Sequence, residues 1–221
     1  MKPIRKFISD AQRRQFNDKV ILVDLLDNKI GEATKLEAHL QPQTSPHRAF
    51  SVFAFTDDKF LLQRRSKEKI TYPLLWTNTC CSHPIPQIEE NGLEGIKKAA
   101  TRRLKYEMGM TISEMMLIDK LVYRSTPKNN KYEEFEVDYV LICKATPHII
   151  NPTEIAETRL SSFDEIRIDL DENESSYTPW FIDVFNAKGK GIIDMLKFFQ
   201  SVDKNKRNEF EESIKLRQSL L

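Results

Sequence analysis

The chain has 221 residues, of which 40% are hydrophobic, so it can bury the core of one large domain or of two small ones. Its 34 Lys and Arg residues are balanced by 33 Asp and Glu residues, and a formal net charge of +1 excludes a global attraction to nucleic acid or to an anionic membrane. No apolar run approaches the about 18 residues of a membrane span. Three cysteines, two of them adjacent, do not make a disulfide framework, so we expect a reduced, cytoplasmic protein.

The first elements predicted along the chain are strands. Residues 20–26 form a β-branched apolar run, and the turn signal at residues 27–28 separates them from a second strand at 29–34. Residues 48–55 and 60–63 are apolar runs on either side of a short polar connection, Thr-Asp-Asp-Lys. This arrangement predicts a hairpin.

A helix follows, and then two more strands. Apolar residues recur at helical spacing through residues 94–108, and Gly109 is a stop signal directly after them. Residues 117–125 and 134–143 are predicted strands, with a Pro-Lys-Asn-Asn turn at 127–130 between them.

From about Ser161 the rest of the chain is predicted to be mostly helical. Strands, a hairpin, a helix, strands and helices in this order favour a single α+β domain. We expect an N-terminal extension at 1–19, the domain at 20–203, and a charged, solvated helix or frayed tail at 204–221.

Reactive side chains are densest in residues 76–84, with the sequence WTNTCCSHP. In an extended segment alternate side chains share a face, so Cys81 and His83 would point one way and Cys80 and Ser82 the other. One thiol would then share its space with an imidazole, which indicates a functional site.

A metal site is the second hypothesis. Glu134 and Glu136 lie at i and i+2 of a predicted strand, and His39, His47 and His83 complete a set of three imidazoles and two carboxylates. Such a set would neutralise a divalent cation and suits Zn, Mn, Fe or Mg. The alternatives are a merely acidic strand edge and a structural zinc site, for which the Cys-Cys-x-His spacing is wrong.

Residues 102–109, RRLKYEMG, resemble the end of a Nudix box, whose usual core is Arg-Glu-apolar-x-Glu-Glu-x-Gly. Arg103 and Tyr106 stand where that pattern has carboxylates, and only Glu107 keeps one. In hydrolases these carboxylates gather the metal ions that activate water. Their loss should weaken hydrolysis while leaving a one-metal diphosphate clamp possible.

Taken together, these motifs resemble the type I isopentenyl-diphosphate isomerase family over residues 20–185. The resemblance rests on His39, His47 to Phe50, Gln63 to Arg65, Thr77 to Pro84, Arg102 to Gly109, Glu134 to Glu136, and Thr178 to Trp180. It implies a Nudix-like α/β/α sandwich with a mixed sheet in a single domain. It also implies an enzyme of isoprenoid biosynthesis that interconverts isopentenyl and dimethylallyl diphosphate by a 1,3 proton shift through a tertiary carbocation.

Two other classes of protein stay open. A Nudix-type diphosphate hydrolase would share the fold and a Mg²⁺ site, but the missing carboxylates argue against it. A non-catalytic, zinc-stabilised binding module would use the same histidines without turnover.

The resemblance also implies the roles of individual residues. Glu136, assisted by Tyr123, would deliver a proton, Cys81 would remove one, and Trp180 would cover the cation, although a core aromatic is the simpler interpretation of Trp180. The implied metal ligands are His39, His47, His83, Glu134 and Glu136, around Mg²⁺, Mn²⁺ or Zn²⁺.

The diphosphate would bring a second ion, Mg²⁺, to Glu107. Its basic clamp would be Lys35, Arg65, Lys69 and Arg103, which otherwise would be ordinary surface charges. Cys80 and Cys143 have no implied role and are expected to be buried. The expected partner is a prenyl diphosphate, with no nucleic acid or membrane, and the chain is expected to be a monomer or a weak dimer.

Overall fold

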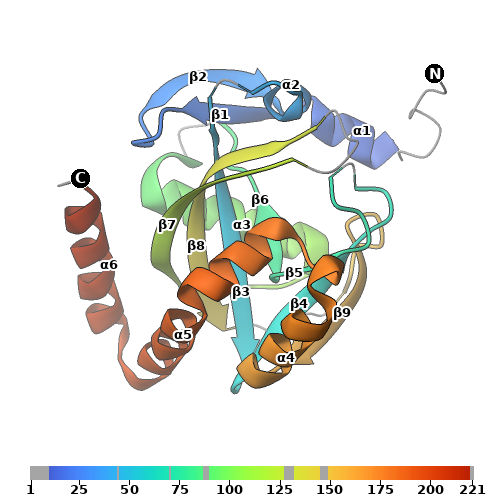
Figure 1. The fold of residues 1–221 in the computed structure, drawn as a ribbon. Coiled ribbons are helices and arrows are strands. Elements are labelled where there is room, and N and C mark those ends of the chain that lie inside the picture. The colour runs from blue at the N-terminus through green and yellow to red at the C-terminus, as the bar shows by residue number, and fades with distance from the viewer. Residues whose placement is uncertain are drawn as a thin grey trace.

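The computed structural model describes residues 10–43, 45–69, 71–86, 90–126, 132–144 and 149–219. Within these ranges a nine-stranded mixed sheet carries helices on both faces (Figure 1). Its strands are β1 (Lys19–Val23), β2 (Lys29–Thr34), β3 (His47–Thr56), β4 (Lys59–Arg65), β5 (Trp76–Thr77), β6 (Cys80–Ser82), β7 (Met115–Ser125), β8 (Glu134–Lys144) and β9 (Ile155–Ser161). The helices are α1 (Asp10–Phe16), α2 (Lys35–His39), α3 (Gly92–Met108), α4 (Phe163–Asn173), α5 (Pro179–Ser201) and α6 (Lys204–Ser219), with a short 3₁₀ turn at Glu174–Ser176.

Strand β3 is the centre of the sheet and is buried over nearly its whole length. It runs parallel to β8, with His47 opposite Glu136, and antiparallel to β6, with Ser51 opposite Cys81. Because side chains on paired strands at matching positions share a face, this register gathers residues from three separate segments at one end of the sheet.

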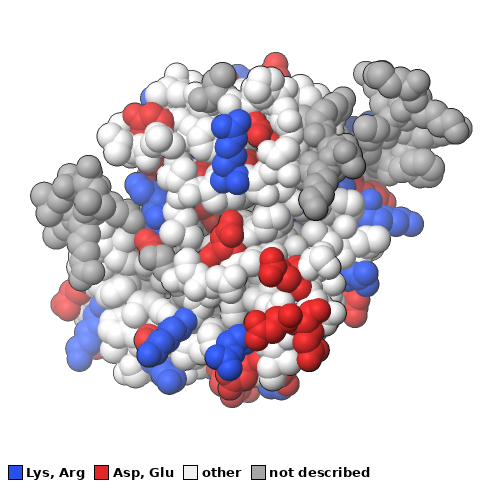
Figure 2. All heavy atoms as spheres, in the orientation of Figure 1, with Lys and Arg blue, Asp and Glu red and all other residues white. Residues whose placement is uncertain are grey.

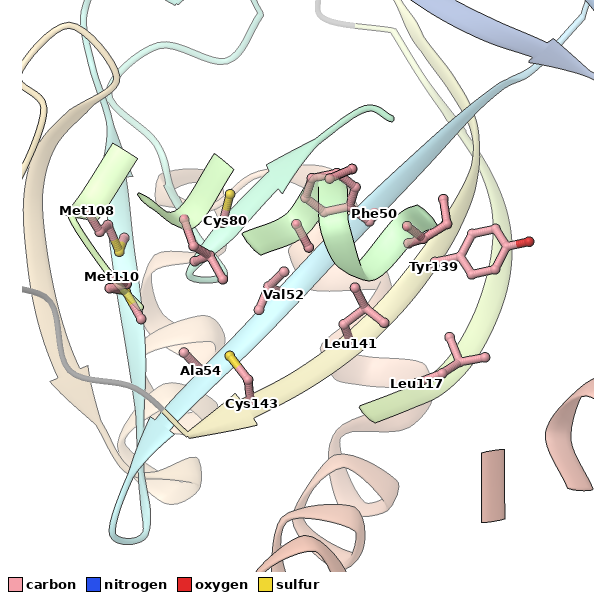
Figure 3. Close-up of a cluster of buried hydrophobic side chains, with 14 of the residues drawn as sticks. Phe50, Val52, Ala54, Cys80, Met108, Met110, Leu117, Tyr139, Leu141 and Cys143 are labelled. Carbon is pink, nitrogen blue, oxygen red and sulfur yellow. The ribbon is translucent and has the colours of Figure 1, made fainter. Parts of the chain in front are cut away.

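Two hydrophobic cores cover the two faces of the sheet. One lies between the sheet and α3 and includes both Cys80 and Cys143, which are buried as expected (Figure 3). The other lies between the sheet and helices α4 and α5, and it includes Trp180 and Phe181. Fully burying a side chain of this size contributes roughly 1.5–3 kcal/mol, so these two layers dominate the stability of the sandwich.

The ends of the helices follow local rules. Helix α3 stops at Gly109, which is left-handed at φ 62° as the stop signal predicted, and any side chain there would crowd the backbone of Ile149. Thr34 and Ser162 begin α2 and α4 with capping boxes that satisfy exposed backbone amides.

The predicted strands, the hairpin and the helix at 94–108 are all present, and the predicted turn at 127–130 lies outside the described residues. Strand β9, which was not predicted from the sequence, pairs with β4 along its length, and the chain is mostly helical after it. Residues 204–219 form the charged helix α6, which is mostly exposed but anchored to the domain by two side chains. Glu211 and Ile214 are buried, and the Glu211 carboxylate accepts a hydrogen bond from the Leu117 amide at 2.6 Å.

The surface carries charges of both signs, in keeping with the small net charge. On the face drawn in Figure 2, acidic side chains gather over α4, and Lys and Arg side chains are scattered among the described residues. None of the helices in the described part of the chain combines the length and the apolar character needed to cross a membrane.

Candidate active site

A cavity of about 640 Å³, partly open to solvent, lies at the end of the sheet where β3, β6 and β8 meet. Of the site residues predicted from the sequence, all but three line it. The three that do not are His47, Arg103 and Glu107. Helix α1 contributes Gln12 and Phe16 to the wall, so a segment expected to be an extension borders the site.

The predicted metal ligands converge. One potential ligand atom from each of five residues lies within 4.8 Å of the others, and all five residues are buried: His39, His47, His83, Glu134 and Glu136. They come from α2, β3, the residue after β6, and β8. Sequence spacing could not bring the first two histidines beside the others. The register of β3 with β8 places His47 opposite Glu136, and the Glu133 amide, which donates to the His39 carbonyl at 2.8 Å, holds the end of α2 beside β8.

The hydrogen bonds of this cluster fit a cation at its centre. His39 Nδ1 lies 2.6 Å from the Lys35 carbonyl oxygen, so Nδ1 donates to this carbonyl and Nε2 is turned toward the cluster. There Nε2 lies 3.0 Å from Glu134 Oε2. Likewise His47 Nε2 and His83 Nε2 lie 3.1 Å apart, and both lie close to Glu136 Oε1. Three imidazole nitrogens and two carboxylate oxygens packed this closely are ligands that a divalent cation prefers, so the cluster fits a metal ion.

The protonation of the histidines agrees with this arrangement. Burial, together with the positive charge of Lys35, holds the pKa of His83 well below its ordinary value. Burial also lowers the pKa of His47, despite its hydrogen bond to Glu136. Both imidazoles are therefore neutral, as metal ligands must be.

Glu136 joins the cluster to a phenol. Its Oε1 faces His47 at 3.2 Å and His83 at 2.8 Å, while its Oε2 accepts a hydrogen bond from the Tyr123 hydroxyl. Burial favours the protonated carboxyl, but interactions with His47 and Tyr123 outweigh it and lower the pKa of Glu136. Burial and the charge of Glu136 raise the pKa of Tyr123, so the phenol stays protonated and can donate.

The two adjacent cysteines face opposite sides of the sheet. Cys80 is fully buried in the core beneath α3, whereas Cys81 lines the cavity with His83, as strand alternation predicts. Ser82 also lines the cavity, contrary to that alternation, because β6 ends at this residue. Burial raises the pKa of the Cys81 thiol to about 12, and Arg65 opposes this shift from 3.6 Å away through Nη1.

Trp180 closes the cavity from the α5 side. Its indole is almost fully buried, contacts Tyr72 edge-on with ring centroids 5.3 Å apart, and lies 6.3 Å from the ring of Tyr123. The Arg65 guanidinium lies 5.2 Å from the indole centroid. The indole therefore belongs both to the core and to the cavity wall. Its position is compatible with both interpretations from the sequence, a core aromatic and a residue that covers the cation.

Cationic side chains gather at the other side of the cavity. Lys35 lines both this cavity and a smaller adjacent one of about 290 Å³, which Arg103 lines as well. Burial and the charges of Lys69 and Arg103 lower the pKa of Lys35 to about 8. A cationic group held this close to other cations has a strong electrostatic preference for an anion.

Glu154, which the sequence did not single out, holds these cations in place. The fully buried carboxylate forms ion pairs with Lys69 and with Arg103, the latter at 3.2 Å. It also accepts hydrogen bonds from Gln12 at 2.9 Å and Gln15 at 2.5 Å, which dock α1 beside the cavity. An acidic residue just before a strand is too common a pattern to have marked it.

Glu107 lies behind this cationic group. Its Oε1 accepts hydrogen bonds from Arg103 at 2.6 and 3.1 Å, and its side chain is 1% exposed. It therefore reaches the cavities only through Arg103 in this structure.

The arrangement combines a hydrogen-bonded acid, a thiol, an aromatic face and a cationic end in one partly closed space. A phenol and a carboxylate can exchange a proton with a substrate, and a dry aromatic face can stabilise a positive charge. The cationic end suits a phosphorylated substrate.

Comparison with known proteins gives consistent results. The family model of the NUDIX domain matches residues 45–181. The chain is 40% identical to isopentenyl-diphosphate Delta-isomerase 1 of Mus musculus, over 79% of this chain and 83% of that protein. It is 34% identical to the isopentenyl-diphosphate delta-isomerase of Schizosaccharomyces pombe, over 90% and 91%. The crystal structure of DR0079 from Deinococcus radiodurans covers 71% of this chain and 90% of its own with a TM-score of 0.50, and at 17% identity this likeness concerns the fold alone.

Proposed function

The chain belongs to the isopentenyl-diphosphate delta-isomerase family of NUDIX-domain proteins, and from that premise we propose how its cavity carries out the reaction. The protein isomerises isopentenyl diphosphate to dimethylallyl diphosphate. Protonating the terminal alkene carbon produces a tertiary carbocation, and removing a proton from the neighbouring allylic carbon completes the shift. The site therefore needs an acid, a base, protection from water and a group that stabilises positive charge.

The acid is the Tyr123–Glu136 pair. The phenol donates its hydrogen bond to the carboxylate, so a proton can pass along this contact to the alkene. Two imidazoles hold the other carboxylate oxygen, which restrains the orientation of the Glu136 side chain.

The base is Cys81. Its sulfur opens onto the same cavity as the acid. Burial disfavours the thiolate, and the Arg65 guanidinium 3.6 Å away opposes this effect and would stabilise the thiolate that accepts the allylic proton. In the reverse reaction the thiol donates and the carboxylate side accepts, because the two steps are symmetric. The net reaction releases and consumes no proton, because the proton that the sulfur gains returns to the Tyr123–Glu136 pair by exchange with solvent before the next turnover.

Trp180 stabilises the carbocation with its indole face. A cation over a desolvated Trp face gains about 2 kcal/mol or more. Its burial supports this role, because solvent that would capture the carbocation is excluded from that wall.

The diphosphate is held by Lys35, Arg65, Lys69 and Arg103. Arg65 and Arg103 are buried and the Lys69 side chain is 11% exposed, so low solvent exposure strengthens their charge-assisted hydrogen bonds to phosphate oxygens. Arg65 reaches both Cys81 and Trp180, so it would join the clamp to the reacting end of the substrate.

Two metal ions complete the proposal. The three histidines with Glu134 and Glu136 would hold Mg²⁺, Mn²⁺ or Zn²⁺, and when bound this ion would fix the Glu136 carboxylate and lower its proton affinity. Mg²⁺ would accompany the diphosphate toward Glu107. That approach requires Arg103 to release part of its contact with Glu107.

The observation that carries the proposal is that the Tyr123–Glu136 pair, the Cys81 thiol and the Trp180 ring border one cavity. A diphosphate hydrolase would need carboxylates that gather metal ions around an attacking water, and Arg103 and Tyr106 occupy those positions. The cytoplasmic location and the monomeric or weakly dimeric state stay predictions.

The test incubates the protein, Mg²⁺ and isopentenyl diphosphate in deuterated water. We expect dimethylallyl diphosphate to appear and deuterium to enter both prenyl diphosphates, with no inorganic phosphate or pyrophosphate formed by hydrolysis. Stoichiometric phosphate release without isomerisation would establish the hydrolase instead.

A further inference from the structure

Three uncharged polar side chains in the 76–84 segment have no part in the chemistry above. Thr77, Asn78 and Thr79 are almost completely buried, at 0%, 1% and 0% exposure. A buried polar group is costly unless it is hydrogen-bonded, so the partners of these side chains reveal what they hold together.

Thr79 only secures the segment to the sheet and makes no contact with the cavity. Its hydroxyl donates to the Leu61 carbonyl at 2.6 Å and accepts from the Ala54 amide at 2.7 Å. Both partners are backbone groups of the hairpin formed by β3 and β4, and neither lines the cavity.

Asn78 instead joins two parts of the active site. Its Nδ2 donates to the Cys80 carbonyl at 2.8 Å and to the Val52 carbonyl at 3.2 Å. Its Oδ1 accepts from the Trp180 indole Nε1 at 3.2 Å and from the Thr77 hydroxyl at 2.8 Å. The Cys80 carbonyl belongs to the peptide bond that leads into Cys81. A single amide therefore connects the backbone of the base with the ring of the cation-stabilising residue.

The start of α5 is fixed to the same segment. The Thr178 amide donates to the Trp76 carbonyl at 2.9 Å, and the Thr178 hydroxyl donates to the Thr77 hydroxyl at 2.9 Å. These bonds fix the backbone that carries Trp180, but they leave the side-chain torsions of the indole to be set by its packing and by Asn78.

We propose that Asn78 is a positioning residue of the isomerase, which orients the indole of Trp180 relative to the Cys81 thiol so that the ring faces the carbon where positive charge develops. The proposal rests on the function proposed above. Asn78 touches neither substrate nor metal, so its contribution is confined to steps in which the substrate is cationic.

The size of the effect has an upper bound. Loss of the whole cation–π contribution of a desolvated Trp, about 2 kcal/mol, corresponds to roughly 30-fold in binding of a cation. A misoriented ring keeps part of the cation–π contribution, so we expect the affinity for the cationic species to fall by roughly 5- to 30-fold. Binding of the uncharged prenyl group should change little, because the clamp residues do not contact Asn78.

The experiment compares two probes at equilibrium, in the metal-loaded protein with Mg²⁺. One is isopentenyl diphosphate, and the other is a diphosphate whose branched carbon is replaced by a tertiary ammonium, which carries the positive charge of the carbocation. For Asn78→Ala we expect the preference for the ammonium probe to fall by roughly 5- to 30-fold, and kcat to fall by a similar factor at nearly constant KM. Asn78→Ser provides a second variant in case the alanine variant does not fold.

Two further variants isolate the mechanism. Trp180→Phe removes the indole N–H, so adding Asn78→Ala to it should change the preference by less than about twofold if Asn78 acts through Trp180. Thr79→Val removes a buried hydroxyl of the same segment and serves as the matched control, with lower thermal stability but an unchanged preference. Hydrogen exchange of the Trp180 indole N–H gives a second measurement. It should be slow in wild type and faster in Asn78→Ala, and the variant Trp76→Phe assigns the signal by removing that of the other tryptophan.

The outcomes separate the two proposals. If the Asn78 variants weaken both probes equally, or if Thr79→Val loses the preference as strongly, Asn78 is only structural and the inference is overturned. An additive effect of Asn78→Ala in the Trp180→Phe background would overturn it as well. If wild type neither isomerises its substrate nor prefers the ammonium probe, the proposed function fails instead.

Discussion

Replacing Glu154 with Gln tests how the cationic side of the site is held. Burial raises the pKa of this carboxyl, but the charges of Lys69 and Arg103 outweigh burial and lower it from 4.5 to about 2. Because the folded pKa is depressed, the resulting stability is fully present above about pH 4.5 and is lost as pH falls toward about 2. A difference of about 2.5 units at ~1.36 kcal/mol each corresponds to about 3 kcal/mol at neutral pH.

The assay is urea denaturation of wild type and Glu154→Gln at neutral pH and at about pH 3.5. We expect a gap of about 3 kcal/mol in the free energy of unfolding at neutral pH. This gap should narrow by about 1 kcal/mol at the lower pH, because the carboxyl of the unfolded wild type takes up a proton there while the folded carboxylate stays ionised. Glu157→Gln is the matched control, because this exposed carboxylate on the neighbouring strand pairs only loosely with Arg64 at 3.5 Å and should change stability by less than about 0.5 kcal/mol. A gap that stays constant with pH would refute the reasoning.

Three other expectations follow from the same contacts. Tyr123→Phe removes the hydroxyl that donates to Glu136, so kcat should fall by roughly 100-fold with KM nearly unchanged in steady-state kinetics, whereas a change in KM alone would contradict the acid role. Dialysis against a chelator should lower the thermal midpoint, reversibly on adding a divalent cation, because an ion bound by the five clustered ligands stabilises the folded state; an unchanged midpoint would mean that no ion is held there. Ile214→Ala should cost about 2–3 kcal/mol in denaturant unfolding because this side chain of α6 is buried, and a cost near zero would mean that α6 does not pack against the domain through it.

The parts of the fold that local patterns determine were predicted from the sequence. The hairpin around residues 56–59 and the helix ending at Gly109 each have a clear period and a clear boundary signal. Strand β9 has no such pattern, because only its first and last residues, Ile155 and Ser161, are buried, and its pairing with β4 is a long-range contact. Helix α6 is too highly charged to indicate burial, and it packs because Lys97 and the Leu117 amide satisfy Glu211.

In the candidate site, too, local patterns predicted some features, and long-range contacts determine the others. Strand alternation distinguished Cys81 from Cys80, since it depends only on local geometry. The convergence of His39 and His47 on the two carboxylates came from the family resemblance, because it depends on sheet register and on the docking of α2 against β8, which spacing does not reveal. Glu154 was missed because its importance depends entirely on partners distant in sequence.

The most direct test of the central claim compares the two adjacent cysteines. Cys81→Ala and Cys80→Ala differ by one position, yet only the first changes a side chain that lines the cavity. We predict that Cys81→Ala still binds isopentenyl diphosphate but loses isomerisation, while Cys80→Ala isomerises its substrate and shows mainly the stability loss of a core truncation. Near-normal isomerisation by Cys81→Ala, or an inactive but folded Cys80→Ala, would contradict the account.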